Sequence, residues 1–160
     1  MTDWHLAQIN IGRLLAPLDH PRIADFTNNL DRINALAEAQ PGFVWRLVGD
    51  GNNATDLRPF PDAEVLVNMS LWRDLDGLAG FVYRSGHRDI MRRRKEFFAP
   101  VELYMALWWV PAGHIPTPME GWDRLQILKE RGPTAEAFTF RNPFPAPGAE
   151  TIRPVLEICE

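Results

Sequence analysis

The sequence predicts an α+β fold, in which a ferredoxin-like antiparallel sheet of four strands carries helices on one face. The main observation is the order of its segments: strand, helix and strand follow one another, and this order occurs twice along the chain. The length is the second observation, because 160 residues, 46% of them hydrophobic, are enough for one domain with its own core.

Four segments are predicted as strands because their side chains alternate or are apolar throughout. LAQINIG alternates and places Gln8 and Asn10 on one face. AEVLVNMSLW also alternates, with Asn68, Ser70 and Trp72 on one face. LYMALWWV is apolar throughout, as expected of a strand that is covered on both faces. The predicted strands are residues 6–12, 43–48, 63–72 and 103–110.

Four segments are predicted as helices from apolar residues at helical spacing and from signals at their ends. Pro21 fits the first turn of the first helix, which QPG at 40–42 ends. Ser85 and Gly86 separate two helical pieces. Thr117, with Pro118 and Glu120 after it, gives the last helix a capping-box start. The predicted helices are residues 23–39, 75–83, 87–98 and 118 to about 131.

The barrel-type domain is predicted to span residues 1–141, and a Pro-rich tail follows at 142–160. NPFPAPGAE is expected to be extended. TIRPVLEIC is expected as an edge strand or an arm packed on a partner subunit, because Pro154 disfavours a central strand. The one cysteine, Cys159, has no partner for an internal disulfide, and the chain begins without a signal-peptide pattern. We therefore expect a cytoplasmic location.

Composition argues against several classes of function. The net charge of −4 gives no reason to expect nucleic-acid or anionic-membrane binding, and we interpret the basic run at 92–95 as a solvated helix surface. No apolar run approaches the roughly 20 residues of a membrane span. Metal-ligand spacing, a glycine-rich phosphate loop and a nucleophile elbow are all missing from the sequence, so no metal site is expected.

One face of the predicted sheet has an unusual composition, because it is too aromatic for open water and too polar for an ordinary core. Its residues are Gln8, Asn10, Asn68, Ser70 and Trp72, with either Trp45 or Arg46 and either Trp108 or Trp109. Two such sheets placed face to face would form a barrel with a mixed lining. We therefore expect a homodimer that encloses a cavity for a small molecule.

Four stretches of the sequence also match a family pattern: LAQINIGRLLAPLDHPRIADFTNNLDRINALAEAQPGFVWRL, FVYRSGHRDIMRRRKEFF, LWWVPAGHIPT and GPTAEAFTF. Together they resemble the domain of unknown function 3291 family over roughly residues 4–140. That family is similar to the dimeric α/β-barrel superfamily, which includes antibiotic-biosynthesis monooxygenases. The resemblance implies the fold and a homodimer. It implies function only loosely, since the superfamily includes cofactor-free oxygenases, haem proteins, lactone-forming enzymes and binding proteins.

His87 is the first candidate for chemistry. It begins the predicted helix 87–98 and shares an apolar stripe with Met91 and Phe98. One interpretation is a general base or acid, since imidazole titrates near neutral pH. Another is a buried structural histidine bonded to a backbone carbonyl or an acidic side chain. A third is haem ligation by His87 or by His114, which would require an open apolar pocket.

The catalytic candidates are His87 as the base, with Asn10 and Asn68 as donors to an oxyanion. The substrate-binding candidates are Trp72, Trp108, Ser70, Arg46 and Tyr83. These residues favour an enzyme of the antibiotic-biosynthesis monooxygenase type, which oxygenates an aromatic or polyketide-like substrate without a cofactor. The alternatives are a non-catalytic small-molecule or haem-binding dimeric barrel, and a structural dimer whose cavity is incidental.

Overall fold

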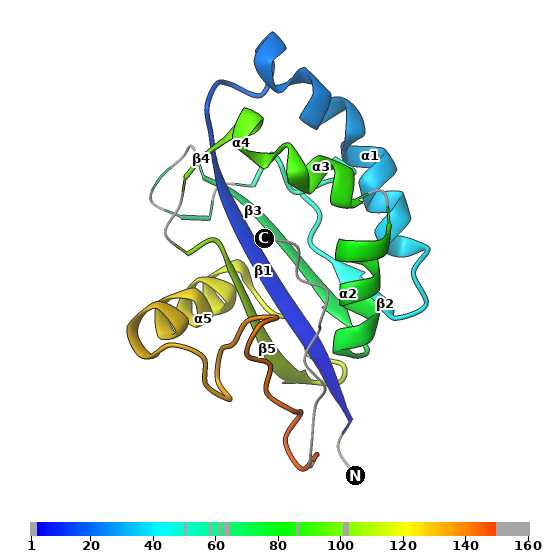
Figure 1. The fold of residues 1–160 in the computed structure, drawn as a ribbon, viewed down its shortest axis with the longest axis vertical. Coiled ribbons are helices and arrows are strands. Elements are labelled where there is room, and N and C mark those ends of the chain that lie inside the picture. Colours follow the sequence, from blue (N-terminus) through cyan, green and yellow to red (C-terminus); the bar gives the residue numbers. More distant parts are fainter. Residues whose placement is uncertain are drawn as a thin grey trace.

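An antiparallel sheet forms the centre of the molecule (Figure 1). β1 lies between β3 and β5, β2 pairs with the far side of β3, and the short β4 pairs with the last residues of β1. This order and direction are those of the ferredoxin-like plan, so the predicted α+β fold class is confirmed. The strands are β1 (Trp4–Leu14), β2 (Phe43–Arg46), β3 (Val65–Trp72), β4 (Phe98–Ala99) and β5 (Met105–Pro111).

The structure is a computed structural model that describes residues 3–49, 51–57, 59–60, 62, 65–85, 87–100 and 103–149. The expectations for residues 150–160, which include Pro154 and Cys159, lie outside the described residues, as does Gly86. The helices are the 3-10 turn η1 (Pro21–Ile23), α1 (Ala24–Glu38), α2 (Leu75–Arg84), α3 (His87–Arg92), α4 (Arg94–Phe97) and α5 (Pro118–Arg131).

The end signals of the helices act as the sequence predicts. The Oγ1 atom of Thr117 accepts from the backbone N–H of Glu120 at 3.1 Å and caps α5. Asp74 caps α2 in the same way, through the N–H of Gly77 at 2.8 Å. The predicted helix 87–98 differs, because Phe98 is extended and pairs with Leu14 in the sheet.

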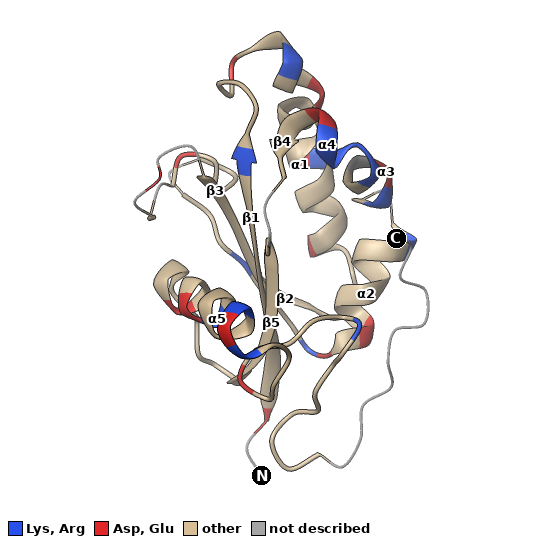
Figure 2. Cartoon of the chain, turned by 60° about the vertical axis from the view of Figure 1, so that its left-hand side comes forward, with Lys and Arg blue, Asp and Glu red and all other residues tan. Residues whose placement is uncertain are grey.

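Helices cover both faces of the sheet (Figure 2). α1 to α4 lie on one face, as predicted, and α5 lies on the other. The expectation that this second face is free of helices within one chain therefore does not hold. Gly121 explains how α5 fits so closely, because a Cβ atom there would lie 2.7 Å from Cδ1 of Ile9.

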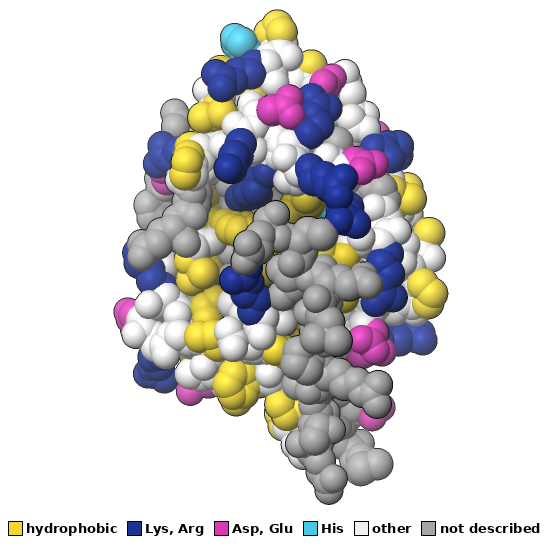
Figure 3. Space-filling model, in the orientation of Figure 1, with side chains coloured by type: hydrophobic (Ala, Val, Ile, Leu, Met, Phe, Trp, Pro, Cys, Tyr) yellow, Lys and Arg dark blue, Asp and Glu magenta, His cyan; other side chains and the backbone are white. Residues whose placement is uncertain are grey.

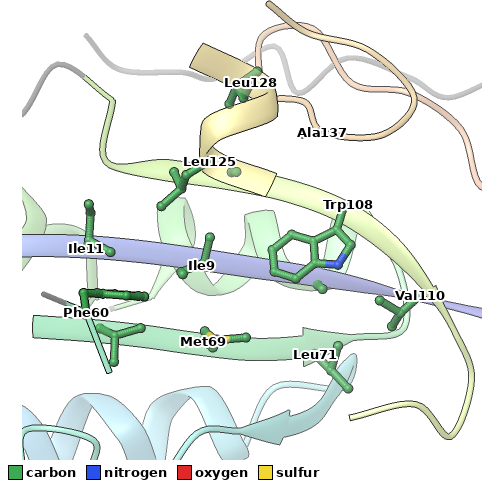
Figure 4. Close-up of a cluster of buried hydrophobic side chains, with 13 residues drawn as sticks. Ile9, Ile11, Phe60, Met69, Leu71, Trp108, Val110, Leu125, Leu128 and Ala137 are labelled. Atoms are coloured by element: carbon green, nitrogen blue, oxygen red, sulfur yellow. The ribbon is translucent and has the colours of Figure 1, made fainter. Parts of the chain in front are cut away.

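The core beneath α5 is apolar (Figure 4). Ile9, Met69 and Trp108 point from three strands towards Leu125 of α5, and the first three of these side chains have no exposed surface. Full burial of side chains this large is the main stabilising contribution on this face. Because side chains alternate along a strand, Gln8 and Asn10, the neighbours of Ile9 on β1, must point to the opposite face of the sheet.

The core beneath α1 and α2 includes Trp72, whose ring stacks on Phe81 of α2 at 5.5 Å. The segment after Arg131 completes it: Phe138 is fully buried and exchanges two backbone hydrogen bonds with Leu107. The described start of the Pro-rich tail packs here too, because the carbonyl of Phe144 accepts from Nε1 of Trp109 at 2.8 Å.

Candidate functional site

A cavity of about 170 Å³ lies between the sheet and the helices α1 to α4. Its walls are mainly apolar, and its polar groups come from the strands β1, β2 and β3, from the helices α1, α3 and α4, and from the loop at 53–55. A dry cavity of about 150 Å³ holds one benzene molecule, so this space suits a single ring. Four uncharged polar residues of the sheet border it: Gln8, Asn10, Asn68 and Ser70.

These polar residues lie on the face that the helices cover. The sequence placed them on a helix-free face between two subunits, and this placement is wrong. The predicted alternation is correct, so Gln8, Asn10, Asn68 and Ser70 share a face with Leu6 and Trp72. However, α1 and α2 pack on this same face, not on the opposite one. A polar cavity is therefore formed within one chain and needs no second sheet to enclose it.

The strand register brings the four side chains together. Gln8 lies opposite Ser70, and Asn10 lies opposite Asn68. Nε2 of Gln8 donates to Oδ1 of Asn68 at 2.7 Å and to Oγ of Ser70 at 2.8 Å. Nδ2 of Asn10 donates to Oε1 of Gln8 and to Oδ1 of Asn68, both at 3.1 Å.

This network leaves specific donors unused. Oγ of Ser70 also accepts from Nε1 of Trp72 at 2.8 Å, so both of its acceptor positions are filled and its own proton is free to donate. The N–H groups of Asn68 have no partner among the described residues, and Asn68 is exposed where the cavity meets solvent. The sheet therefore presents a hydroxyl and an amide donor to whatever enters the cavity.

His87 borders the cavity from the start of α3. Its ring lies 4.5 Å from the ring of Phe81. Burial lowers the pKa of His87 to about 4, and a backbone hydrogen bond with Val82 opposes this shift in part. At neutral pH the imidazole is therefore uncharged, and it is a weak proton acceptor compared with a base whose pKa matches the working pH.

Arg94 also borders the cavity, and the sequence interpretation missed it by treating the whole run at 92–95 as solvated. Its Nη2 donates to the carbonyl of Ile11 at 2.8 Å, and its guanidinium lies over the rings of Tyr104 and Phe98, at 4.3 and 5.0 Å from their centroids. Burial lowers the pKa of Arg94 from its ordinary value. Its position three residues from Met91 and seven from His87, on the same helical stripe, was the signal that could have found it.

The other cation of the lining, Arg46, is already paired. Its Nε donates to Glu38 at 2.7 Å, and its remaining nitrogens donate to Asn52 at 2.7 and 3.1 Å. Arg93, one residue before Arg94, turns the other way and pairs with Asp25 of α1 at 2.7 Å. Lys and Arg side chains are frequent around α3 and α4 on the surface (Figure 3).

Three predicted site residues do not border the cavity. Trp108 lies on the opposite face beneath α5, where its Nε1 donates to Glu120 at 3.3 Å. Tyr83 packs its ring against Phe140 at 5.4 Å. Trp72 is on the correct face but lies behind Ser70, fully buried, so it positions that hydroxyl rather than forming a wall.

His114 lies outside the cavity and hydrogen-bonds Glu120 at 2.8 Å, which fits its interpretation as a residue that packs around the start of α5. Within the described ranges, no three His, Cys, Asp or Glu side chains gather as metal ligands would. None of the described helices has the length and apolar character needed to cross a bilayer.

Comparison with known proteins gives distant structural similarity. SnoaB, a cofactor-independent oxygenase from Streptomyces nogalater, is 17% identical with a TM-score of 0.46, and the match covers 71% of this chain and 97% of that one. A conserved protein from Methanosarcina mazei Go1 is 14% identical with a TM-score of 0.46, over 66% and 90% of the two chains. A protein of unknown function from Nitrosomonas europaea is 13% identical with a TM-score of 0.42, over 74% and 96%.

The search of curated proteins found no match. The scan of family models gave a family whose model covers residues 5–154, which includes every helix and strand described above except Trp4, the first residue of β1. The chain therefore belongs to the family described as Domain of unknown function (DUF3291).

Proposed function

We propose that this protein binds a small phenol-like molecule in the cavity and oxidises it with dioxygen, without a cofactor. One observation carries the proposal: the hydroxyl of Ser70 and the amide of Asn68 are unused donors that the sheet presents to a cavity with mainly apolar walls. Donors fixed in such a site stabilise a negative oxygen far better than mobile water does.

The donors act by favouring the phenolate. With the phenolic oxygen at Ser70 and Asn68, the ring lies against apolar side chains of α1 and α2, such as Leu30 and Phe81. The phenolate then reacts with dioxygen at a C–H carbon ortho or para to the hydroxyl. A C–O bond forms, the O–O bond breaks, and the second oxygen leaves as water with the ring hydrogen and the phenolic proton, so that phenol and dioxygen give quinone and water.

The other candidates have supporting roles in this proposal. Gln8 and Asn10 hold the acceptor oxygen of Asn68, which turns its N–H groups towards the cavity. His87 contributes a neutral wall and a hydrogen-bond acceptor rather than a store for the proton, because its pKa is about 4. The phenolic proton is released to solvent at the side where Asn68 is exposed, and solvent returns one proton to complete the water that forms.

The size of the cavity narrows the substrate. Pockets for drug-sized ligands enclose roughly 300–1,000 Å³, whereas this one encloses about 170 Å³. A single substituted ring therefore fits better than a fused polyketide or a haem. The homodimer is part of the proposal as well, with an interface outside the two sheet faces that the chain's own helices cover.

Oxygen uptake with 2,6-dimethylphenol tests the proposal. We expect uptake above the uncatalysed rate and one quinone formed per dioxygen consumed. Asn68→Ala and Ser70→Ala should each lower kcat by about 100-fold or more, the range seen when one oxyanion donor is removed. The surface variant Asn142→Ala is the matched control and should keep wild-type activity.

Two outcomes count against it. Full activity in Asn68→Ala would remove the assigned oxyanion site. Saturable binding of the phenol with no uptake, across a panel of phenols and hydroquinones, would favour the alternative of a non-catalytic binding protein that uses the same cavity.

A further inference from the structure

No acidic side chain is present among the described residues that border the cavity. Among the described residues that border it, Arg46 and Arg94 are cations, the other polar groups are neutral, and neither Asp nor Glu is present. A cavity that is meant for a neutral molecule gains nothing from an arginine without an acidic partner, because removing a charge from water is costly.

Of the two cations that line the cavity, Arg94 is the one without an acidic partner among the described residues. Arg46 has Glu38 and Arg93 has Asp25 and Glu96 within 2.9 Å, whereas Arg94 makes no ion pair within the part of the chain that the structure describes. Its partners among the described residues are the carbonyl of Ile11 and two aromatic rings, which leaves further N–H groups available. A guanidinium in this state is suited to a carboxylate, which it can bind through two parallel hydrogen bonds.

The strand geometry sets the distance between this cation and the hydroxyl donor. Arg94 is bonded at Ile11, and Ser70 lies opposite Gln8, three residues earlier on β1. At about 3.4 Å per residue, the two levels are about 10 Å apart along the strand. One para-substituted benzene ring spans this separation with a hydrogen bond at each end.

We propose that the ligand of this cavity is a hydroxy-substituted aromatic monocarboxylate, with its carboxylate on Arg94 and its hydroxyl on Ser70 and Asn68. This inference rests on the proposed function for the location of the phenolic oxygen, and adds the charge and the length of the substrate. The two ends are polar and the ring between them meets apolar side chains, which matches the distribution of groups in the lining.

A pair of isosteric probes tests the charge directly. NMR titration of the protein at pH 7 gives the Kd of 4-hydroxybenzoate and of neutral 4-hydroxybenzamide. The wild-type protein should bind the benzoate at least about 10-fold more tightly than the benzamide, since one hydrogen bond to a charged group changes the Kd by about that factor or more. This comparison needs no substitution, so it does not depend on the folding of a variant.

Variants then assign the preference to one residue. Arg94→Gln should abolish the preference for the benzoate, and Arg94→Lys, which keeps the charge but loses the planar fork, should retain part of it. Arg92→Gln is the matched control, because Arg92 is exposed on α3 in the same basic run, and it should behave as wild type.

The outcomes separate this inference from the proposed function. Equal affinity for the two probes, or a preference that survives Arg94→Gln, overturns the assignment of an anionic ligand and leaves phenol oxidation in the cavity standing. A strong preference for the benzoate with no oxygen uptake supports the ligand class and counts against oxidation. Failure of the wild-type protein to bind either probe overturns the inference.

Discussion

At the scale of single residues, the burial of His87 makes the stability of the protein depend on pH. Its pKa is about 4 in the folded chain and about 6.5 in the unfolded chain. The unfolded chain therefore binds more protons between these values. The contribution of His87 to the free energy of unfolding is complete above about pH 6.5 and is lost as the pH falls towards 4.

Urea unfolding at pH 7 and pH 5 measures this contribution. From pH 7 to pH 5, we expect the free energy of unfolding to fall by about 2 kcal/mol more in wild type than in His87→Gln, because glutamine does not titrate. Carboxylates that titrate near pH 5 affect both proteins alike, so the difference isolates the histidine. An equal loss in both proteins would show that the imidazole is solvated in the folded state.

Gln8 is the residue on which the hydrogen-bond network of the sheet depends. It is 5% exposed, donates to two side chains and accepts from Nδ2 of Asn10. Gln8→Met keeps the size of the side chain but removes one hydrogen bond from each of Asn10, Asn68 and Ser70. We expect the free energy of unfolding to fall by about 1–3 kcal/mol, whereas Gln126→Met on α5 should change it by less than about 0.5 kcal/mol. Urea unfolding of both variants tests this expectation. Equal changes in the free energy of unfolding would contradict the role of the network.

At the scale of elements, the contact between α5 and the sheet depends on Gly121. A Cβ atom there would lie 2.7 Å from Cδ1 of Ile9 and 3.2 Å from its Cβ. Gly121→Ala should therefore destabilise the fold by about 1–3 kcal/mol through overpacking, set against up to about 1 kcal/mol of gained helix propensity. Ile9→Val removes the Cδ1 atom, so the double variant should be more stable than the sum of the two single changes predicts.

Gly80 supplies the matched control for this prediction. It also lies within a helix, α2, but the nearest atom to its added Cβ is Oε1 of Gln40 at 4.0 Å. Gly80→Ala should therefore stabilise the protein by about 0.5–1 kcal/mol. Thermal unfolding of the four variants measures both effects, and additivity of the Gly121 and Ile9 changes would contradict the close contact.

The two pieces α3 and α4 show how far helical periodicity predicts a site. The sequence predicts one helix over 87–98, and its period places His87 and Arg94 on one stripe. Both residues border the cavity, although the helix is interrupted at Arg93 and Phe98 joins the sheet. The stripe was therefore predictable. The sequence could not distinguish Arg93, which pairs with Asp25, from Arg94, which has no ion pair among the described residues. The difference depends on where α1 lies.

At the scale of the whole molecule, local patterns predicted the sheet and most helix ends, because alternation and capping are properties of a few neighbouring residues. Alternation of LAQINIG and AEVLVNMSLW correctly placed Asn10 and Asn68 on the same face of the sheet, where the register makes them opposite one another. It could not say which face the helices cover, since a period of two treats both faces alike. The same ambiguity in LYMALWWV assigned Trp108 to the cavity, and the register puts Trp109 beside Leu6 instead.

Coverage of both faces gives a prediction about assembly. Had the sheet been open on one face, separating two subunits would expose a row of apolar side chains and the single chain would unfold. In this structure Trp72 and Trp108, on opposite faces, are both fully buried by their own chain. A dissociated subunit should therefore stay folded, whatever other surface a homodimer uses.

Sedimentation velocity and tryptophan emission over a 100-fold range of protein concentration test this expectation. The mass should fall towards the 18.3 kDa of one chain at the lowest concentration if a dimer dissociates, and the emission maximum and near-ultraviolet circular dichroism should stay constant throughout. The indoles keep their packing because α2 and α5, not a second subunit, cover them. A red shift in emission that follows dissociation would show that a partner chain completes the core.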